Sequence, residues 1–444
     1  MTQRHKYIQS AFQYLILAII LAVTPKLVSA QMLTEADVMA IVLENNYSIR
    51  VAQLDEKVLN NNVTPGNAGF LPQVDATAGT NNSVTNARQE YLSGQINERD
   101  NAKSGSINAG ASLNWTLFNG MRMFTSYDML KQELKAGELQ TRLQIESTLS
   151  NALIVYYNIV QLNQKKAVLE KAVKLGQERV GIANDMLMLG AGSRLGLLQA
   201  EVDLNTDNSE LINLQDLITE ASIALNQLMA RDAATKFTVE DTFKVASVMD
   251  YASLKLKMEQ NNPSLLISQS DQELAQLNLK EIRGRRAPVL GVNVGYSFND
   301  QTSESGFLKT SRTSGFNYGI SASVNIFDGF NLNRQQQNAR IGIEQAELEF
   351  KAYQDQLQAE LLSAFTTYTN KLRMVAFEKQ NLETALVNFE IAGERYRLGE
   401  LSGFEFREAQ KNQLLANDRL INSLYEVRLL EITLMQLSGS VLPE

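Results

Sequence analysis

The stretch GFNYGISASVNIFDGF, from Gly315 to Phe330, carries two kinds of side chain in alternation. Every second residue from Phe316 to Ile326 is apolar, and the residues between them are small or polar. This period of two predicts a β-strand with one apolar and one polar face. The sequence FDG then ends the pattern, and a long polar helix is expected after it. An earlier stretch, INAGASLNWTLFNGM from Ile107 to Met121, alternates in the same way and ends in FNG.

These two stretches belong to a repeat that covers almost the whole chain. Aligning FNG at 118–120 with FDG at 327–329 gives an offset of 209 residues, and this register continues without a gap. Upstream of the strands the offset becomes 216, which places Asn45-Asn46 beside Asn261-Asn262. The period is too long for a solenoid, whose repeats span about 20–50 residues. A duplicated half-molecule is therefore predicted.

Each half is predicted to contain a helix, a β-hairpin, a very long helix, a turn and a return helix. The first repeat, 31–250, is assigned helix 33–66, hairpin 73–117 with strands 73–82 and 105–117, long helix 119–189, helix 194–230 and linker 231–250. The second repeat, 251–444, is assigned helix 251–286, hairpin 289–326 with strands 289–299 and 315–326, long helix 328–398 and helix 403–438. Polar loops are expected at about 80–104 and 299–314.

The long helices are expected to pack side by side. Neither contains proline, and in the second one Ala339, Ile343, Ala346 and Phe350 recur at spacings of four and three. At 1.5 Å per residue, about 70 residues form a rod of roughly 100 Å. Taken alone, this pattern predicts no more than a coiled coil.

The first thirty residues have the pattern of a secretory signal. Arg4 and Lys6 precede an apolar run at 15–23, and Val28-Ser29-Ala30 offers a cleavage site. This run is shorter than the ~20 residues of a membrane-spanning helix, although a retained anchor is the alternative. The processed chain is expected to begin near Gln31 without a cysteine, which excludes an acylated lipoprotein.

The composition excludes several classes of function. The chain has no cysteine, and its one histidine, His5, lies in the signal, so thiolate metal sites and a histidine base are absent. Removing the three basic residues of the signal changes the formal charge from −8 to −11, a poor match to nucleic acid. No phosphate-binding glycine loop and no supported carboxylate pair is found. We therefore expect no enzyme, no cofactor and no metal.

The four strands are predicted to cross a membrane as part of a barrel. Their lengths are close to the 9–11 residues of a tilted transmembrane strand. A soluble half-buried sheet also alternates, but here the second face is Gly, Ser, Asn and Thr rather than charged, and the chain is exported. Aromatic residues also lie where an interfacial girdle is expected, namely Trp115, Phe118, Phe316, Tyr318 and Phe327.

A sheet of four strands in lipid cannot remain open. Each unpaired backbone group in hydrocarbon costs several kcal/mol, so several copies must share one closed barrel. Two copies would give eight strands and a filled interior, whereas three would give twelve strands and a lumen.

With these features together, the chain without its signal resembles the TolC-type outer-membrane efflux proteins. The resemblance rests on the duplicated halves, the aromatic-[Asn/Asp]-Gly turns and two helical turns, MLGAGSRLGLLQAEVDL from Met188 and RLGELSGFEFREAQKN from Arg397. It implies an α+β membrane protein: a homotrimer with a 12-stranded β-barrel in the outer membrane and a 12-helix α-barrel across the periplasm. It also implies a passive exit duct whose partners are a periplasmic adaptor and an inner-membrane transporter.

The resemblance also implies roles for residues at the helical turns. Leu189, Gly190, Ser193, Leu398, Gly399 and Ser402 would receive the adaptor, although glycines also end helices without any partner. Glu405 and Glu408 would ring the closed aperture and attract cations, with two solvated glutamates as the alternative.

Tyr396 matches a tyrosine that the family uses in a latch between helices. The acidic and basic latch positions are occupied here by Gly196 and Leu401, so the usual latch is incomplete. Simple packing is the alternative role of Tyr396.

Two other functions are weighed against the duct. The first is a soluble periplasmic coiled-coil scaffold whose strands form a small capping sheet. The second is an enzyme that uses Glu405 or Glu408.

Overall fold

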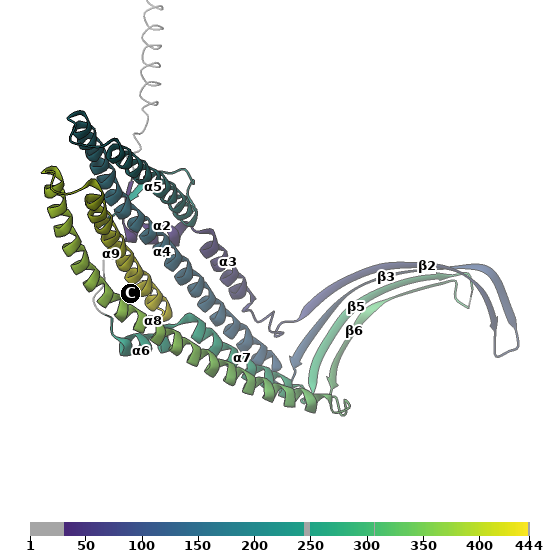
Figure 1. Cartoon of the computed structure of the whole chain (residues 1–444). Coiled ribbons are helices and arrows are strands. Elements are labelled where there is room, and N and C mark those ends of the chain that lie inside the picture. Colours follow the sequence, from purple (N-terminus) through teal and green to yellow (C-terminus); the bar gives the residue numbers. More distant parts are fainter. Residues whose placement is uncertain (1–30, 244–248, 306, 443–444) are drawn as a thin grey trace, which may run out of the picture. The chain divides into compact units, whose positions relative to one another are not determined.

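The computed structural model describes residues 31–243, 249–305 and 307–442, and the predicted signal at 1–30 lies outside them. The elements follow in the order β1 (Gln31–Leu33), α2 (Glu35–Asn45), α3 (Tyr47–Asn62), β2 (Gln73–Glu90), β3 (Ile96–Phe118), α4 (Arg122–Met188), α5 (Arg194–Leu228), β4 (Phe237–Val239), α6 (Tyr251–Asn261), α7 (Pro263–Gly284), β5 (Val289–Ser303), β6 (Thr310–Ser323), α8 (Asn331–Arg397) and α9 (Gly403–Leu437) (Figure 1). Among the described residues, no helix has both the length and the apolar character needed to cross a membrane.

The chain forms two compact units. Within the described residues, the first unit comprises 31–46, 151–243 and 371–429, and the second comprises 47–150, 249–370 and 430–442. The two longest helices, α4 and α8, have 67 residues each and run through both units.

The second unit contains a four-stranded antiparallel sheet. Its strands lie side by side in the order β2-β3-β5-β6 and form one curved sheet (Figure 1). The predicted loops at 80–104 and 299–314 are largely wrong, because β2 continues to Glu90 and β6 already begins at Thr310. These extensions are polar on both faces, so they lack the apolar alternation from which strands were predicted. At its other end β6 stops at Ser323, three residues before the predicted 326.

Four helices of the second unit form a layer in the order α3–α4–α7–α8. The Thr141 hydroxyl of α4 donates to the Ala52 carbonyl of α3 at 3.2 Å, and Arg122 of α4 pairs with Glu281 of α7 at 2.8 Å. Apolar side chains then join α7 to α8, namely Leu279, Ile282, Leu332, Ala339 and Ile343.

The first unit also contains four packed helices, parts of α4, α5, α8 and α9. Arg179 of α4 pairs with Asp203 of α5 at 3.0 Å. On its other side, α4 meets α9 through Gln161 and Asn422 at 2.7 Å, and α9 meets α8 through an ion pair between Arg419 and Glu378 at 3.1 Å. A small parallel sheet of β1 and β4 lies in the same unit.

The helices predicted at 33–66 and 251–286 are each two helices. The breaks fall at Asn46 and Asn262, whose backbones are extended. The side-chain amide of Asn46 donates to the Leu228 carbonyl at 2.8 Å, and that of Asn262 donates to the Leu437 carbonyl at 3.0 Å. Each break thus supplies a donor to the last turn of a return helix, where carbonyl groups lack partners within the helix.

Candidate functional site

The sheet has one apolar and one polar face. Because residues paired across strands share a face, the register places Leu113, Val294 and Tyr318 in one row. The adjacent row along the strands, on the opposite face, contains Ser112, Gly295 and Asn317. On the outer strand β6, the large side chains of the apolar face are 78–83% exposed, namely Phe316, Tyr318 and Ile320. An apolar surface of this kind needs a cover, and none of the described residues of the chain supplies one.

The height of the apolar face suits a bilayer. It extends along β5 from Leu290 to Phe298, which corresponds to about 27 Å of strand. At the usual barrel tilt of about 40°, this becomes roughly 20 Å, close to the ~25 Å apolar band of outer-membrane barrels. The next row on this face holds an ion pair between Asp300 and Arg312 at 2.6 Å. Charge therefore returns where the apolar band ends.

The predicted interfacial aromatics lie at several heights on the sheet. Trp115 and the half-buried Phe118 lie at the helical end, where the Trp115 ring nitrogen donates to the Phe70 carbonyl at 2.8 Å. Tyr318 and Phe316 lie farther along β6, opposite Val294 and Tyr296.

Phe327 follows β6 and contacts Phe330 edge to face, with the ring centroids 5.3 Å apart. The five aromatics therefore occupy both the helical end and the interior of the apolar face, and they do not share one level.

The two helical turns have the same construction. Gly190 and Gly399 both have left-handed backbones, with φ of 73° and 76°, as is usual for glycine just after a helix. Ser193 and Ser402 then begin α5 and α9, and each hydroxyl oxygen accepts a backbone N–H three residues later. The glycines and serines therefore shape the turns.

The large apolar side chains at these turns are exposed. Leu189 is 83% exposed and Leu398 is 73% exposed. Phe404 is 73% exposed as well, although no sequence pattern had assigned it a role. In the sequence, only its position two residues after Ser402, which caps α9, indicates that it lies beside the turn.

Glu405 has a structural role at the second turn. Its carboxylate accepts hydrogen bonds from the Ser402 hydroxyl at 2.7 Å and from the Ser402 N–H at 3.0 Å. Together with the bond back to the hydroxyl, this forms a capping box, which the sequence Ser-x-x-Glu encodes. The hydrogen bonds from Ser402 lower the pKa of Glu405. Glu408 lies exposed one turn farther along α9.

Tyr396 is part of an apolar cluster at the second turn. It is 7% exposed, and its ring stacks on Phe406 with centroids 5.0 Å apart and planes 8° from parallel. Leu401 packs against the same cluster, while Gly196 donates its N–H to the Ser193 hydroxyl. The structure therefore places these three residues in packing and capping roles.

A partly buried ion network that no sequence pattern predicted joins α4, α5 and α9. Arg407 contacts both oxygens of Asp207, at 2.9 and 2.8 Å. It also lies 3.6 Å from Asp203, which in turn binds Arg179. The four residues are spread over 229 positions of the chain, so no local pattern reveals them.

Within residues 31–243, 249–305 and 307–442, no group of three or more acidic or histidine side chains is placed to hold a metal ion.

Comparison with known proteins relates most of the chain to outer-membrane efflux proteins. The model of the family "Outer membrane efflux protein" matches residues 38–231 and 256–440. The outer membrane efflux protein BepC of Brucella suis is 20% identical over 398 residues, which cover 89% of this chain and 83% of BepC. The outer membrane protein TolC of Vibrio cholerae is 20% identical over 403 residues, covering 85% and 84%.

Solved structures show the same fold. The CmeC outer membrane channel of Campylobacter jejuni has a TM-score of 0.75 at 18% identity, covering 91% of this chain and 85% of CmeC. The outer membrane protein VceC of Vibrio cholerae has a TM-score of 0.72 at 15% identity, covering 91% and 96%. The chain therefore belongs to the outer membrane efflux protein family, whose members span the outer membrane into the periplasm.

Proposed function

We propose that this protein is the exit duct of a tripartite efflux or secretion system, in which a homotrimer passively conducts substrate from a periplasmic adaptor and an inner-membrane pump to the exterior. The observation that carries the proposal is the two-faced sheet with two unpaired edges. The proposed duct performs no chemistry, and its relatives are efflux proteins of the outer membrane rather than enzymes.

The sheet supports closure of a barrel by several copies. Its outer strands are β2 and β6, and neighbouring strands alternate in direction throughout. A second copy that places its β2 beside β6 continues the antiparallel alternation. Closure removes the unpaired backbone groups, each of which costs several kcal/mol in hydrocarbon. Three copies give twelve strands around a lumen, as an exit duct requires.

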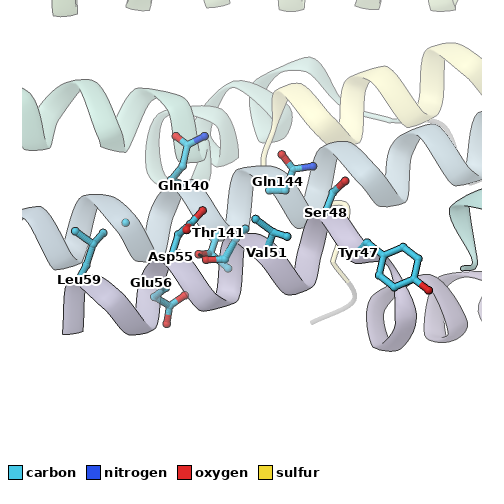
Figure 2. Close-up of a pocket in the computed structure, with 11 residues that line it drawn as sticks. Tyr47, Ser48, Val51, Asp55, Glu56, Leu59, Gln140, Thr141 and Gln144 are labelled. Atoms are coloured by element: carbon cyan, nitrogen blue, oxygen red, sulfur yellow. Dashed lines mark hydrogen bonds between the residues drawn. The ribbon is translucent and has the colours of Figure 1, made fainter. Parts of the chain in front are cut away.

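The helical layer of the second unit supports the same closure. At one edge, α3 exposes Tyr47, Val51, Leu54 and Val58, whose spacing of four, three and four is that of a coiled-coil seam. A groove of about 430 Å³ lies between α3 and α4 (Figure 2). At the other edge, α8 exposes Ile341 and Leu348, which are one heptad apart. We assign α8 of the next copy to cover the α3 edge, so that four helices per copy give a twelve-helix barrel.

The proposed duplication, with repeats at 31–250 and 251–444, is supported by equivalent backbone features. Left-handed residues occur at the same places of both repeats, in the pairs Gly120 and Gly329, Met121 and Phe330, Gly190 and Gly399, and Ala230 and Gly439. The side-chain amides of Asn46 and Asn262 also make the same contact with a return helix.

The helical turns are the proposed periplasmic tips. Leu189 and Leu398 project from them and supply apolar contacts for the adaptor, while Gly190, Gly399, Ser193 and Ser402 hold the turns in shape. Glu405 and Glu408 are proposed to surround the aperture, where three copies bring six carboxylates together. The lowered pKa of Glu405 keeps its carboxylate charged while it caps α9.

Fractionation and export test this proposal. The duct remains in the outer-membrane fraction and needs detergent for extraction, whereas a coiled-coil scaffold leaves with the periplasmic fluid. The double variant Leu189→Asp with Leu398→Asp is expected to lose export and adaptor cross-linking while trimers still form. Leu256→Asp, at an exposed leucine of α6, is the control and should export normally. Normal export by the double variant would refute docking at the turns.

A further inference from the structure

We propose that the ion network of Arg179, Asp203, Asp207 and Arg407 is the latch that keeps the periplasmic end of the duct closed. It would do so by holding the helical pair α8–α9 against the pair α4–α5. This inference rests on the proposed function and specifies how the closed state is maintained in this chain.

The network crosses from one helical pair to the other. Arg407 of α9 forms a two-pronged pair with Asp207 of α5, at 2.9 and 2.8 Å. Asp203, one turn earlier on α5, lies 3.6 Å from Arg407 and accepts a hydrogen bond from Arg179 of α4 at 3.0 Å. Separating the two helical pairs therefore breaks the bonds of Arg407 to both aspartates.

Burial makes the network resist partial opening. Arg179 is 4% exposed and Asp207 is 6% exposed. A buried charge that loses its partner is strongly unfavourable. The hydrogen bond to Asp207 raises the pKa of Arg407 above its ordinary value, so the guanidinium stays charged. The side chains of Arg407 and Asp203 are more accessible, at 19% and 30% exposed, so the cost of separating the helical pairs falls mainly on the buried carboxylate of Asp207.

The position of the network suits a latch near the tip. Arg179 lies nine residues before the end of α4, or about 14 Å along the helix. Farther from the turns, α4 and α9 are joined by Lys165 and Asp418 at 2.8 Å. In the part of the chain that the structure describes, the bonds of Arg407 to Asp203 and Asp207, together with that of Arg179 to Gln410, are the hydrogen bonds and ion pairs between the two helical pairs that lie nearest to the turns.

The residues at the family's latch positions do not provide such a bond. Tyr396 stacks on Phe406, Leu401 packs against the same cluster, and Gly196 has no side chain. Leu175 and Ile182 of α4 also pack against this cluster. Those apolar contacts are non-directional, whereas the two-pronged pair of Arg407 with Asp207 fixes a geometry.

The network is also incompletely satisfied, as expected of a contact that must open. Gln410 accepts a hydrogen bond from Arg407 at 3.1 Å, but its buried side-chain Nε2 finds no hydrogen-bond partner among the described residues. The buried Nε of Arg179 lacks one as well. Unpaired polar atoms raise the free energy of the closed state, because they lose water without gaining a protein partner. The closed and open states are thereby brought closer in free energy.

Single-channel recording of purified trimers in planar lipid bilayers tests the latch. Asp207→Asn and Arg407→Gln should each increase the open fraction about 5- to 150-fold, the usual range of coupling between distinct parts of a protein. The double variant Asp207→Asn with Arg407→Gln should open no more often than the single variants, because both changes break the same pair, whereas two independent injuries to the fold would add. Trimer yield is measured for every variant.

Arg419→Gln is the matched control. It removes an ion pair between α9 and α8, with Glu378 at 3.1 Å, which lies inside one helical pair. Its open fraction should equal that of the wild type. The latch is refuted if Asp207→Asn and Arg407→Gln conduct like the wild type, or if Arg419→Gln opens the duct equally. If no trimer conducts, including the wild type and every variant, the proposed duct itself is refuted.

Discussion

Replacing Val294 by arginine should strongly impair folding of the protein in the membrane. Val294 lies in the middle of the apolar face, four residues from both the Leu290 row and the Phe298 row. An arginine on the lipid face of a barrel costs about 2–4 kcal/mol near the bilayer midplane. Three copies share the proposed barrel, so the total is about 6–12 kcal/mol. This is comparable with the ~5–15 kcal/mol that stabilises a typical domain.

Ser297→Arg is the matched control for this substitution. Ser297 lies three residues away on the same strand, but on the polar face, where its paired neighbours are Gly110 and Gly315. In the proposed barrel this side chain points into water, so the change should cost less than about 1 kcal/mol. Urea unfolding of both variants in lipid vesicles measures the difference, and the amount in the outer-membrane fraction reports it in cells. Equal losses for the two variants would refute the assignment of the faces.

Three further predictions concern the helical parts of the chain. Gly120→Ala should destabilise the protein by several kcal/mol more than Gly329→Ala. Both backbones are left-handed, but a methyl group at 120 would collide with the carbonyl oxygen of Gly284, the last residue of α7, whereas one at 329 would make only an ordinary van der Waals contact; thermal unfolding of the extracted protein compares them. Asn262→Ala should cost about 1–3 kcal/mol in the same assay, since it leaves a carbonyl of α9 and an amide of α7 without their side-chain partner. Burial raises the pKa of Glu281, but hydrogen bonds from two arginines outweigh this effect and lower the pKa. The Glu281 carboxylate therefore stabilises the fold above its ordinary pKa, and this stabilisation is lost as the pH falls through the lowered value. Glu281→Gln should therefore flatten the loss of thermal stability below about pH 4.5, and an unchanged pH profile would contradict this.

The strands could be predicted only where one of their faces is apolar. The alternation from Phe316 to Ile320 has that pattern, because one side chain in two belongs to the apolar face. From Asn81 to Glu90 the strand is almost entirely polar, and its sequence looks like that of a loop. Pairing with β3, which the local sequence does not encode, keeps this segment extended.

The breaks in the shorter helices could have been predicted from the sequence. Asn262 precedes a proline, which disfavours a helical backbone at that residue, and Asn46 occupies the equivalent place in the first repeat. The capping role of Glu405 was likewise present in the sequence Ser-Gly-Phe-Glu. The network of Arg179 and Arg407 could not be predicted, since it depends on the order in which α4, α5 and α9 pack.

The mass of the purified protein tests the central claim most directly. The protein would be extracted from the outer-membrane fraction in a mild detergent and its complexes weighed by native mass spectrometry. We expect three times the mass of the processed chain, because the edges of β2 and β6 are satisfied only when copies share one barrel. A single chain that stays in solution without detergent would contradict the account.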